Sequence, residues 1–178
     1  MFAYISRILR SKWHDRAAAR TSAPQCAVYQ ADGAPLAYRP ELVPELTHEH
    51  RLLEASFASL VAAHRSNDVE ACIFRLTGFT NILRAHLLKE NLQLYRYLRH
   101  AFPGDHAAAA RTQALRAEMQ EIGKALNAFA NAYLGATWDE HRRRRLGRDL
   151  NEMGQILAQR IATEELALYP LYLPPKHP

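Results

Sequence analysis

The chain has 178 residues, 48% of them hydrophobic, and a formal net charge of +5 with its histidines counted as neutral. This length fits one domain with a short appendage, and the charge is too small to indicate nucleic-acid binding by itself. No run of about 18 apolar residues is present, so no membrane-spanning helix is expected. Cys26 and Cys72 form no disulfide pattern, and we therefore expect a cytoplasmic protein.

Residues 1–16 predict a short amphipathic helix. Its apolar residues recur at helical spacing with basic residues between them, and it lacks the long apolar stretch of a signal peptide. We expect this helix to pack on the flank of the main domain, or to touch an anionic membrane or a partner. Residues 17–41 are rich in Ala, Pro, Gly, Gln and Ser and predict a linker. The apolar residues of the helix are Phe2, Ile5, Ile8, Leu9 and Trp13.

Residues 42–173 predict a single bundle of four helices. The expected ranges are 42–66, 68–102, 105–134 and 137–173. Asp68 is a predicted N-cap, Gly135 ends the third helix, and Thr137 with Glu140 matches a capping box for the fourth. Short connections place neighbouring helices antiparallel. The predicted fold is therefore all-α, an antiparallel up-down-up-down four-helix bundle preceded by the extra N-terminal amphipathic helix.

Each predicted helix carries an apolar stripe in steps of three and four residues, and each stripe is interrupted near its middle. Because the middles of antiparallel helices of similar length meet at one level, we expect the interrupting side chains to converge. A buried, uncompensated carboxylate costs several kcal/mol, so the carboxylates among them must be protonated, paired or bound to a cation. The interruptions are His50 in the first helix, His86 and Glu90 in the second, Met119 in the third, and Arg160 and Glu164 in the fourth.

Three segments of the bundle resemble the hemerythrin-like (HHE, cation-binding) domain. They are Glu49-His50, the run from His86 to Asn91, and the run from Glu164 to Pro170. The resemblance covers about residues 44–172. It implies a four-helix bundle around a two-iron centre, in proteins that bind oxygen, sense redox state or nitric oxide, or handle iron.

The resemblance also implies which residues bind metal. It implies a complete set of ligands for one iron of a two-iron centre, but not for the other. In the family's pattern, Arg160 stands where the fourth helix has an imidazole, and Met119 stands on the third helix where another is expected. The resemblance thus implies that the ligands of the second iron are lost, and that a permanent positive charge replaces them. The implied ligands of the first iron are His50, His86, Glu90 and Glu164.

Two states of this centre follow. One is a mononuclear site, whose two nitrogen and two carboxylate ligands suit Fe(II), Zn or Mn. The other is a metal-free core in which Arg160 forks between Glu90 and Glu164. A guanidinium beside a divalent metal is electrostatically unfavourable, so the sequence favours the metal-free state. A third reading extends Arg160 to the surface with its stem in the core. A full two-iron centre and oxygen carriage are not expected.

The expected function is regulation or binding without catalysis. No oriented nucleophile and base and no phosphate-binding Gly loop are present, and a single iron that activates oxygen or peroxide is the remaining enzymatic reading. The segment from Leu150 to Arg160 also resembles one helix of the bacterial regulator-of-sigma-D anti-sigma proteins, which implies a transcription or signalling protein as partner. The alternative is a metal-dependent sensor or iron handler. The basic run Arg142–Arg145 is a solvated face or a contact for an acidic partner.

Overall fold

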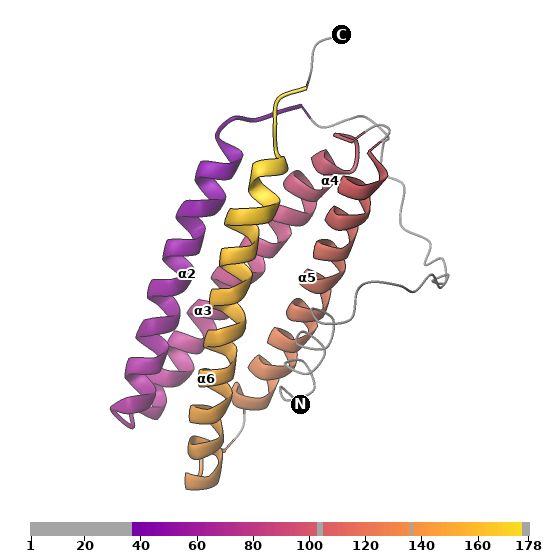
Figure 1. The fold of residues 1–178 in the computed structure, drawn as a ribbon. Coiled ribbons are helices and arrows are strands. Elements are labelled where there is room, and N and C mark those ends of the chain that lie inside the picture. Colours follow the sequence, from indigo (N-terminus) through magenta and orange to yellow (C-terminus); the bar gives the residue numbers. More distant parts are fainter. Residues whose placement is uncertain (1–36, 103–104, 136, 176–178) are drawn as a thin grey trace, which may run out of the picture.

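The computed structural model describes residues 37–102, 105–135 and 137–175, and all regular structure in these ranges is helical. Four helical stretches lie side by side (Figure 1). The all-α prediction is confirmed, whereas the N-terminal helix over residues 1–16 lies outside the described residues. The helices are α2 (Leu42–Arg65), α3 (Val69–Lys89), η1 (Glu90–Leu94), α4 (Tyr95–Leu98), α5 (His106–Tyr133), α6 (Glu140–Thr163), η2 (Glu164–Leu168) and η3 (Tyr169–Leu171).

Helix ends follow the capping residues, with one correction. The Asp68 carboxylate accepts a hydrogen bond from the Ala71 amide at 2.8 Å, as predicted. Gly135, at a φ of 88°, supplies the left-handed residue that follows α5. The predicted capping box of Thr137 is wrong, because Asp139 caps α6 and accepts from the Arg142 amide at 2.7 Å. The Asp139 carboxylate lies directly before the first turn and can reach its free amides, whereas Thr137 lies two residues earlier and cannot.

The second and fourth helical stretches each contain a π-helical turn that the sequence did not predict. These turns are η1 and η2, and each begins at a buried glutamate, Glu90 or Glu164. A π turn holds an extra residue, so two consecutive residues face the core. Leu94 and Tyr95 are both buried after the first turn, and Leu168 and Tyr169 are both buried at the end of the second. The two turns therefore bring tyrosines into the core beside the polar residues.

The apolar stripes pack as predicted. Most stripe positions are buried, while Val43, Phe57, Leu157 and Leu171 are partly buried at the edges of the core. None of the helices in the described ranges is long and apolar enough to cross a membrane. The buried stripe residues include Leu46, Leu53, Leu60, Leu76, Phe79, Leu83, Leu94, Tyr97, Leu115, Met119, Ile122, Leu126, Phe129, Tyr133, Leu150, Met153 and Leu168.

Helices α2 and α6 approach each other closely at two glycines of α6. A Cβ atom on Gly154 would lie 2.9 Å from Cε1 of Phe57, and one on Gly147 would lie 2.8 Å from Cε1 of His64. The Phe57 ring also packs against Phe79, with ring centroids 5.3 Å apart. The ring therefore has little freedom to move, and α6 needs glycine at this level to bring its polar residues next to those of α2.

We expect Gly154→Ala to lower the free energy of unfolding by about 1–3 kcal/mol, because the new methyl group overpacks the contact with Phe57. Gly78→Ala in α3 is the matched control. Gly78 is exposed and has no atom within 4 Å of an added Cβ, so this change should stabilise the helix by about 0.5–1 kcal/mol. Urea denaturation of both variants measures the difference. Equal stabilisation by the two substitutions would contradict the close approach of α2 and α6.

Candidate metal centre

The four predicted ligands lie buried in the core of the bundle, displaced from its middle toward the end at which α2 begins. His50 comes from α2, His86 from α3, and Glu90 and Glu164 from the first positions of η1 and η2; none is more than 2% exposed. One ligand atom each of His50, His86 and Glu164 lies within 4.8 Å of the others. These three side chains therefore form a group that could hold a metal ion, and Glu90 lies next to it.

The two sides of the His50 ring contact different carboxylates. Its Nε2 lies 3.0 Å from Oε2 of Glu164, and its Nδ1 lies 2.9 Å from Oε1 of Glu165. The Glu165 carboxylate is itself held from outside by the Arg51 guanidinium at 3.4 Å. The outer carboxylate therefore fixes the orientation of the ring and turns Nε2 toward the centre.

His86 has the same arrangement on the other side of the centre. Its Nδ1 lies 3.0 Å from Oε2 of Glu49, and the Lys89 ammonium forms an ion pair with that carboxylate. Its Nε2 faces inward and lies 3.9 Å from Oε1 of Glu90. A histidine that binds a metal usually donates its second ring N–H to a carboxylate or carbonyl in this way, because the contact fixes the tautomer and raises ligand basicity.

Glu90 joins the group through Tyr169. The Tyr169 hydroxyl donates to Oε1 of Glu90 at 3.2 Å and lies 3.0 Å from Nε2 of His50. The other oxygen of Glu90, Oε2, is buried and has no hydrogen-bond partner among the described residues. An orphaned buried carboxylate oxygen is costly in a packed core, and a cation at this position would supply the missing contact.

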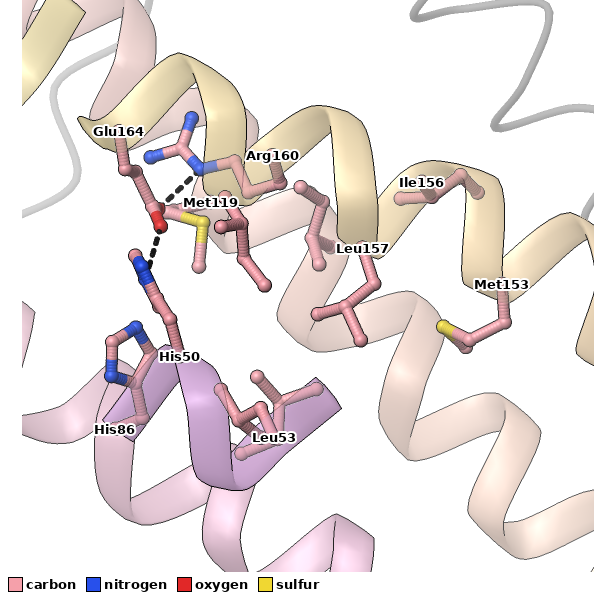
Figure 2. Close-up of a pocket in the computed structure, with 12 residues that line it drawn as sticks. His50, Leu53, His86, Met119, Met153, Ile156, Leu157, Arg160 and Glu164 are labelled. Carbon is pink, nitrogen blue, oxygen red and sulfur yellow. Dashed lines mark hydrogen bonds and ion pairs between the residues drawn. The ribbon is translucent and has the colours of Figure 1, made fainter. Parts of the chain in front are cut away.

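Arg160 is buried and pairs with Glu164, as one of the sequence hypotheses expected. Its Nε donates to Oε1 of Glu164, and Figure 2 shows His50 and Arg160 both reaching this carboxylate. No hydrogen bond or ion pair joins Arg160 to Glu90, so the predicted fork between the two glutamates is wrong. The π turn η1 places Tyr95 in that position instead, and Nη2 of Arg160 donates to the Tyr95 hydroxyl at 2.7 Å. Nη1 lies 4.0 Å from Oε2 of Glu118.

Arg160 does not extend to the surface either, since it is 7% exposed. Met119, the other predicted replacement, is buried beside it (Figure 2). Met119 lines a cavity of about 20 Å³ next to the centre, together with apolar residues of all four helical stretches. This space is enough for about one water-sized particle. The cavity is also lined by His50, His86, Arg160 and Glu164.

The protonation states follow from burial and neighbours. Burial and the nearby charge of Glu164 raise the pKa of Glu90 well above its usual value. Burial would also raise the pKa of Glu164, but His50 and Arg160 outweigh it and lower that pKa. Burial lowers the pKa of His86. Without a metal, the centre therefore holds an ionised Glu164, a protonated Glu90 and a neutral His86 with a free lone pair.

The donor set fits a divalent cation. Two imidazoles and a carboxylate converge, a second carboxyl group has a free oxygen, and the space beside them is small. Such mixed nitrogen and oxygen sets bind iron, zinc or manganese. His50, His86 and Glu164 would hold the ion directly. Glu90 would join them on losing its proton.

Comparison with known families agrees with this geometry. The sequence matches the hemerythrin HHE cation binding domain over residues 41–172, a span that includes every residue of the centre. The chain belongs to the hemerythrin HHE family. Comparison with curated proteins and with solved structures gave no match. The family assignment supports a centre that binds a metal such as iron. In this chain, the group of His50, His86 and Glu164 is where the metal could bind.

Sequence reasoning missed the residues that surround the ligands. Glu49 and Glu165 each adjoin a predicted ligand, and both stand in the segments that carry the resemblance. Their positions next to His50 and Glu164 in the sequence were the only indication that they contact the ligands. Tyr169 also stands in such a segment. Tyr95 gave no signal, because its burial depends on the π turn before it.

In the metal-free protein, we expect the free energy of unfolding to fall as pH rises above 6.5. Burial lowers the pKa of His50, but its hydrogen bonds to Glu164 and Glu165 outweigh this, so the pKa is raised from the ordinary 6.5. A raised histidine pKa stabilises the fold fully below 6.5, and this contribution is lost as pH rises through the higher folded value. His86 has a lowered pKa and is neutral in both states above 6.5, so it does not contribute in this range.

Urea denaturation in the presence of a chelator, measured at several pH values from 6 upward, checks this expectation. His50→Gln should remove most of the decline, whereas His48→Gln, at an exposed position of the same helix, should keep it. Identical pH profiles for the wild type and His50→Gln would contradict the charged pairing of His50 with the two glutamates.

Proposed function

We propose that this protein is a regulatory or binding protein whose hemerythrin-like centre holds one divalent metal ion, most simply iron. The observation that carries the proposal is the matched orientation of His50 and His86. In both, a carboxylate from the outer side, Glu165 or Glu49, holds Nδ1, and Nε2 faces Glu164 or Glu90. A core that only neutralised its own charges would not need both rings oriented in this way.

Arg160 supports a single ion rather than two. The resemblance assigns its position to an imidazole of the second iron, and a guanidinium cannot lose its proton to become a ligand. Its positive charge already compensates part of the Glu164 charge. Oxygen carriage by two irons and an enzymatic role are therefore not part of the proposal.

A bound iron ion would supply redox chemistry and a place where a small ligand could bind. The protein residues orient the two imidazoles, keep the ion away from bulk water and hold a proton on Glu90 until the ion arrives. The regulatory output would go to a protein partner in transcription or signalling, and the expected up-down-up-down order leaves the outer faces of all four helices available for it. We also propose a cytoplasmic location, since Cys72 is a free buried thiol.

A second candidate is a metal-free regulatory bundle. The observation in its favour is the closed set of contacts around Glu164, which is bonded to His50 on one oxygen and to Arg160 on the other. In that state the centre would serve only to specify the packing of the core. Metal content separates the two candidates directly.

We expect the purified protein, loaded with Fe(II) and desalted, to retain one metal ion per chain. His86→Ala should abolish retention, because it removes an inward-facing nitrogen. Glu49→Gln should weaken affinity about 10- to 100-fold, because the outer carboxylate orients His86. Glu54→Gln, at an exposed position of α2, is the matched control and should bind like the wild type. Elemental analysis and competition with a chromogenic chelator measure both quantities. Absence of metal in the wild type would favour the metal-free candidate.

We expect the double variant Met119→His, Arg160→His to bind two metal ions per chain. It restores the two imidazoles that the resemblance assigns to the second iron, and it removes the fixed positive charge. Metal stoichiometry is measured beside helix content by circular dichroism, so that a misfolded variant is recognised. Two ions in the wild type, or one ion in a folded double variant, would contradict the assignment of Arg160 and Met119 to the lost half of the centre.

A further inference from the structure

A line of tyrosine side chains leads from the centre to one end of the bundle. It begins at Tyr169 in the core, continues through Tyr172 one turn later, and ends in a cluster with Tyr97 and Tyr38. None of these four residues serves as a proposed metal ligand. Their common feature is a phenol, the group of the aromatic side chains that most readily gives up an electron together with a proton.

The inner end of the line contacts the centre directly. The Tyr169 ring stacks on the His50 ring with centroids 5.5 Å apart and an interplanar angle of 12°. Its hydroxyl donates to Oε1 of Glu90 at 3.2 Å. The phenol therefore touches both an imidazole and a carboxyl group of the centre, so the first tyrosine of the line is in direct contact with the proposed ligands.

A single 3₁₀ turn connects Tyr169 to Tyr172. The Tyr172 amide donates to the Tyr169 carbonyl at 3.0 Å. Residues three positions apart lie on the same side of a 3₁₀ helix. Tyr172 is the C-cap of this turn, so a single backbone turn connects the tyrosine at the centre with the tyrosine of the outer cluster.

The outer end opens to the surface. The Tyr172 ring lies 4.6 Å from Tyr97 and 5.0 Å from Tyr38, measured between ring centroids. Tyr172 and Tyr97 are 6% and 8% exposed, and Tyr38 is half-buried. The Tyr97 hydroxyl donates to the carbonyl of Leu173, an exposed residue. An electron that leaves this cluster has only a short distance to a reaction partner in solution.

We propose that Tyr169, Tyr172, Tyr97 and Tyr38 form a relay that carries single electrons between the surface and a metal ion in the centre. The inference rests on the proposed function, because the inner end needs a redox-active ion. Electrons move inward when the ion has been oxidised. Tyr169 then gives one electron to the centre, and its hydroxyl proton leaves with the electron and ends in the water that the oxidant forms. Tyr169 regains an electron and a proton when Tyr172 and then the outer phenols are oxidised in turn.

The overall reaction balances with a peroxide as oxidant. Hydrogen peroxide accepts two electrons and two protons, its O–O bond breaks, and two water molecules form. In the protein loaded with Fe(II), the ion supplies one electron and becomes Fe(III). One phenol supplies the other electron with its proton and becomes a neutral tyrosyl radical, and solvent supplies the second proton. If the tyrosines served only to pack the core, no electron transfer through them would be expected. The presence and positions of tyrosyl radicals therefore distinguish a relay from structural packing.

The test uses the full-length protein loaded with Fe(II), with iron content measured first. One equivalent of hydrogen peroxide is added, samples are frozen rapidly for electron paramagnetic resonance, and oxidised tyrosines are located by mass spectrometry after spin trapping. We expect a tyrosyl radical signal and trapped products at Tyr97 and Tyr38. Metal-free protein given the same peroxide should yield neither.

Two variants separate a relay from simple packing. Tyr172→Phe keeps the ring but removes the phenol, so products at Tyr97 and Tyr38 should be lost while iron binding is retained. Tyr133→Phe is the control: Tyr133 is equally buried, but it contacts Asp149, Phe129 and Trp138 rather than the centre. This variant should leave the products unchanged.

The outcomes also separate the relay from the proposed function. A protein that binds no iron would overturn both. A protein that binds iron but forms no tyrosyl radical would overturn the relay and leave the metal centre standing. The same holds if the products at Tyr97 and Tyr38 persist in Tyr172→Phe, or if the radical lies at Tyr133.

Discussion

The buried carboxylate of Glu164 is the constraint on which the rest of the centre depends. It is 1% exposed and ionised, and an ionised group in this position costs several kcal/mol unless opposite charge surrounds it. His50 bonds one oxygen and Arg160 the other. These two partners come from α2 and α6, so the need to compensate one charge fixes how the two helices meet. The glycines of α6 permit the close approach that this meeting requires.

The charges outside the centre follow from the same requirement. His50 and His86 each turn one nitrogen outward to a partly exposed glutamate, and Arg51 and Lys89 hold those glutamates from the surface. The result is an alternation of acidic and basic groups from the core to the solvent on both sides. Pairs at the exposed end of such a series contribute little to stability by themselves. Their effect lies in orienting the imidazoles, which are held in place here without a metal.

Much of the fold could be read from periodicity, and the details of the centre could not. The stripe through Leu46, His50 and Leu53 predicted which residues are buried, because helical spacing determines which side chains share a face. The π turns carry no such signal, since no residue type marks the extra position within a helix. That omission explains the wrong partner for Arg160: without η1, Tyr95 would not be expected in the core. The capping error has a simpler cause, since Thr137 and Asp139 both suit an N-cap.

Under the proposed function, Arg160 stands where the resemblance implies a ligand of a second metal, and this limits what the centre would report. Arg160 cannot alter its charge or its redox state, so its side of the centre stays constant. Because that constant charge pairs with Glu164 in the absence of a metal, folding need not wait for the ion. A domain whose folding depends on its metal is unfolded when the site is empty. Such a domain has no folded surface through which it could signal the absence of the metal to a partner. Here the centre is compensated without a metal, and under the proposed function the incoming ion would act first on Glu90, which is bonded to Tyr169. Tyr169 bonds to Glu90 through its hydroxyl and to the Tyr172 amide through its carbonyl, so under the proposed function the last turns of the chain are the route by which a change at Glu90 would reach the end of the bundle.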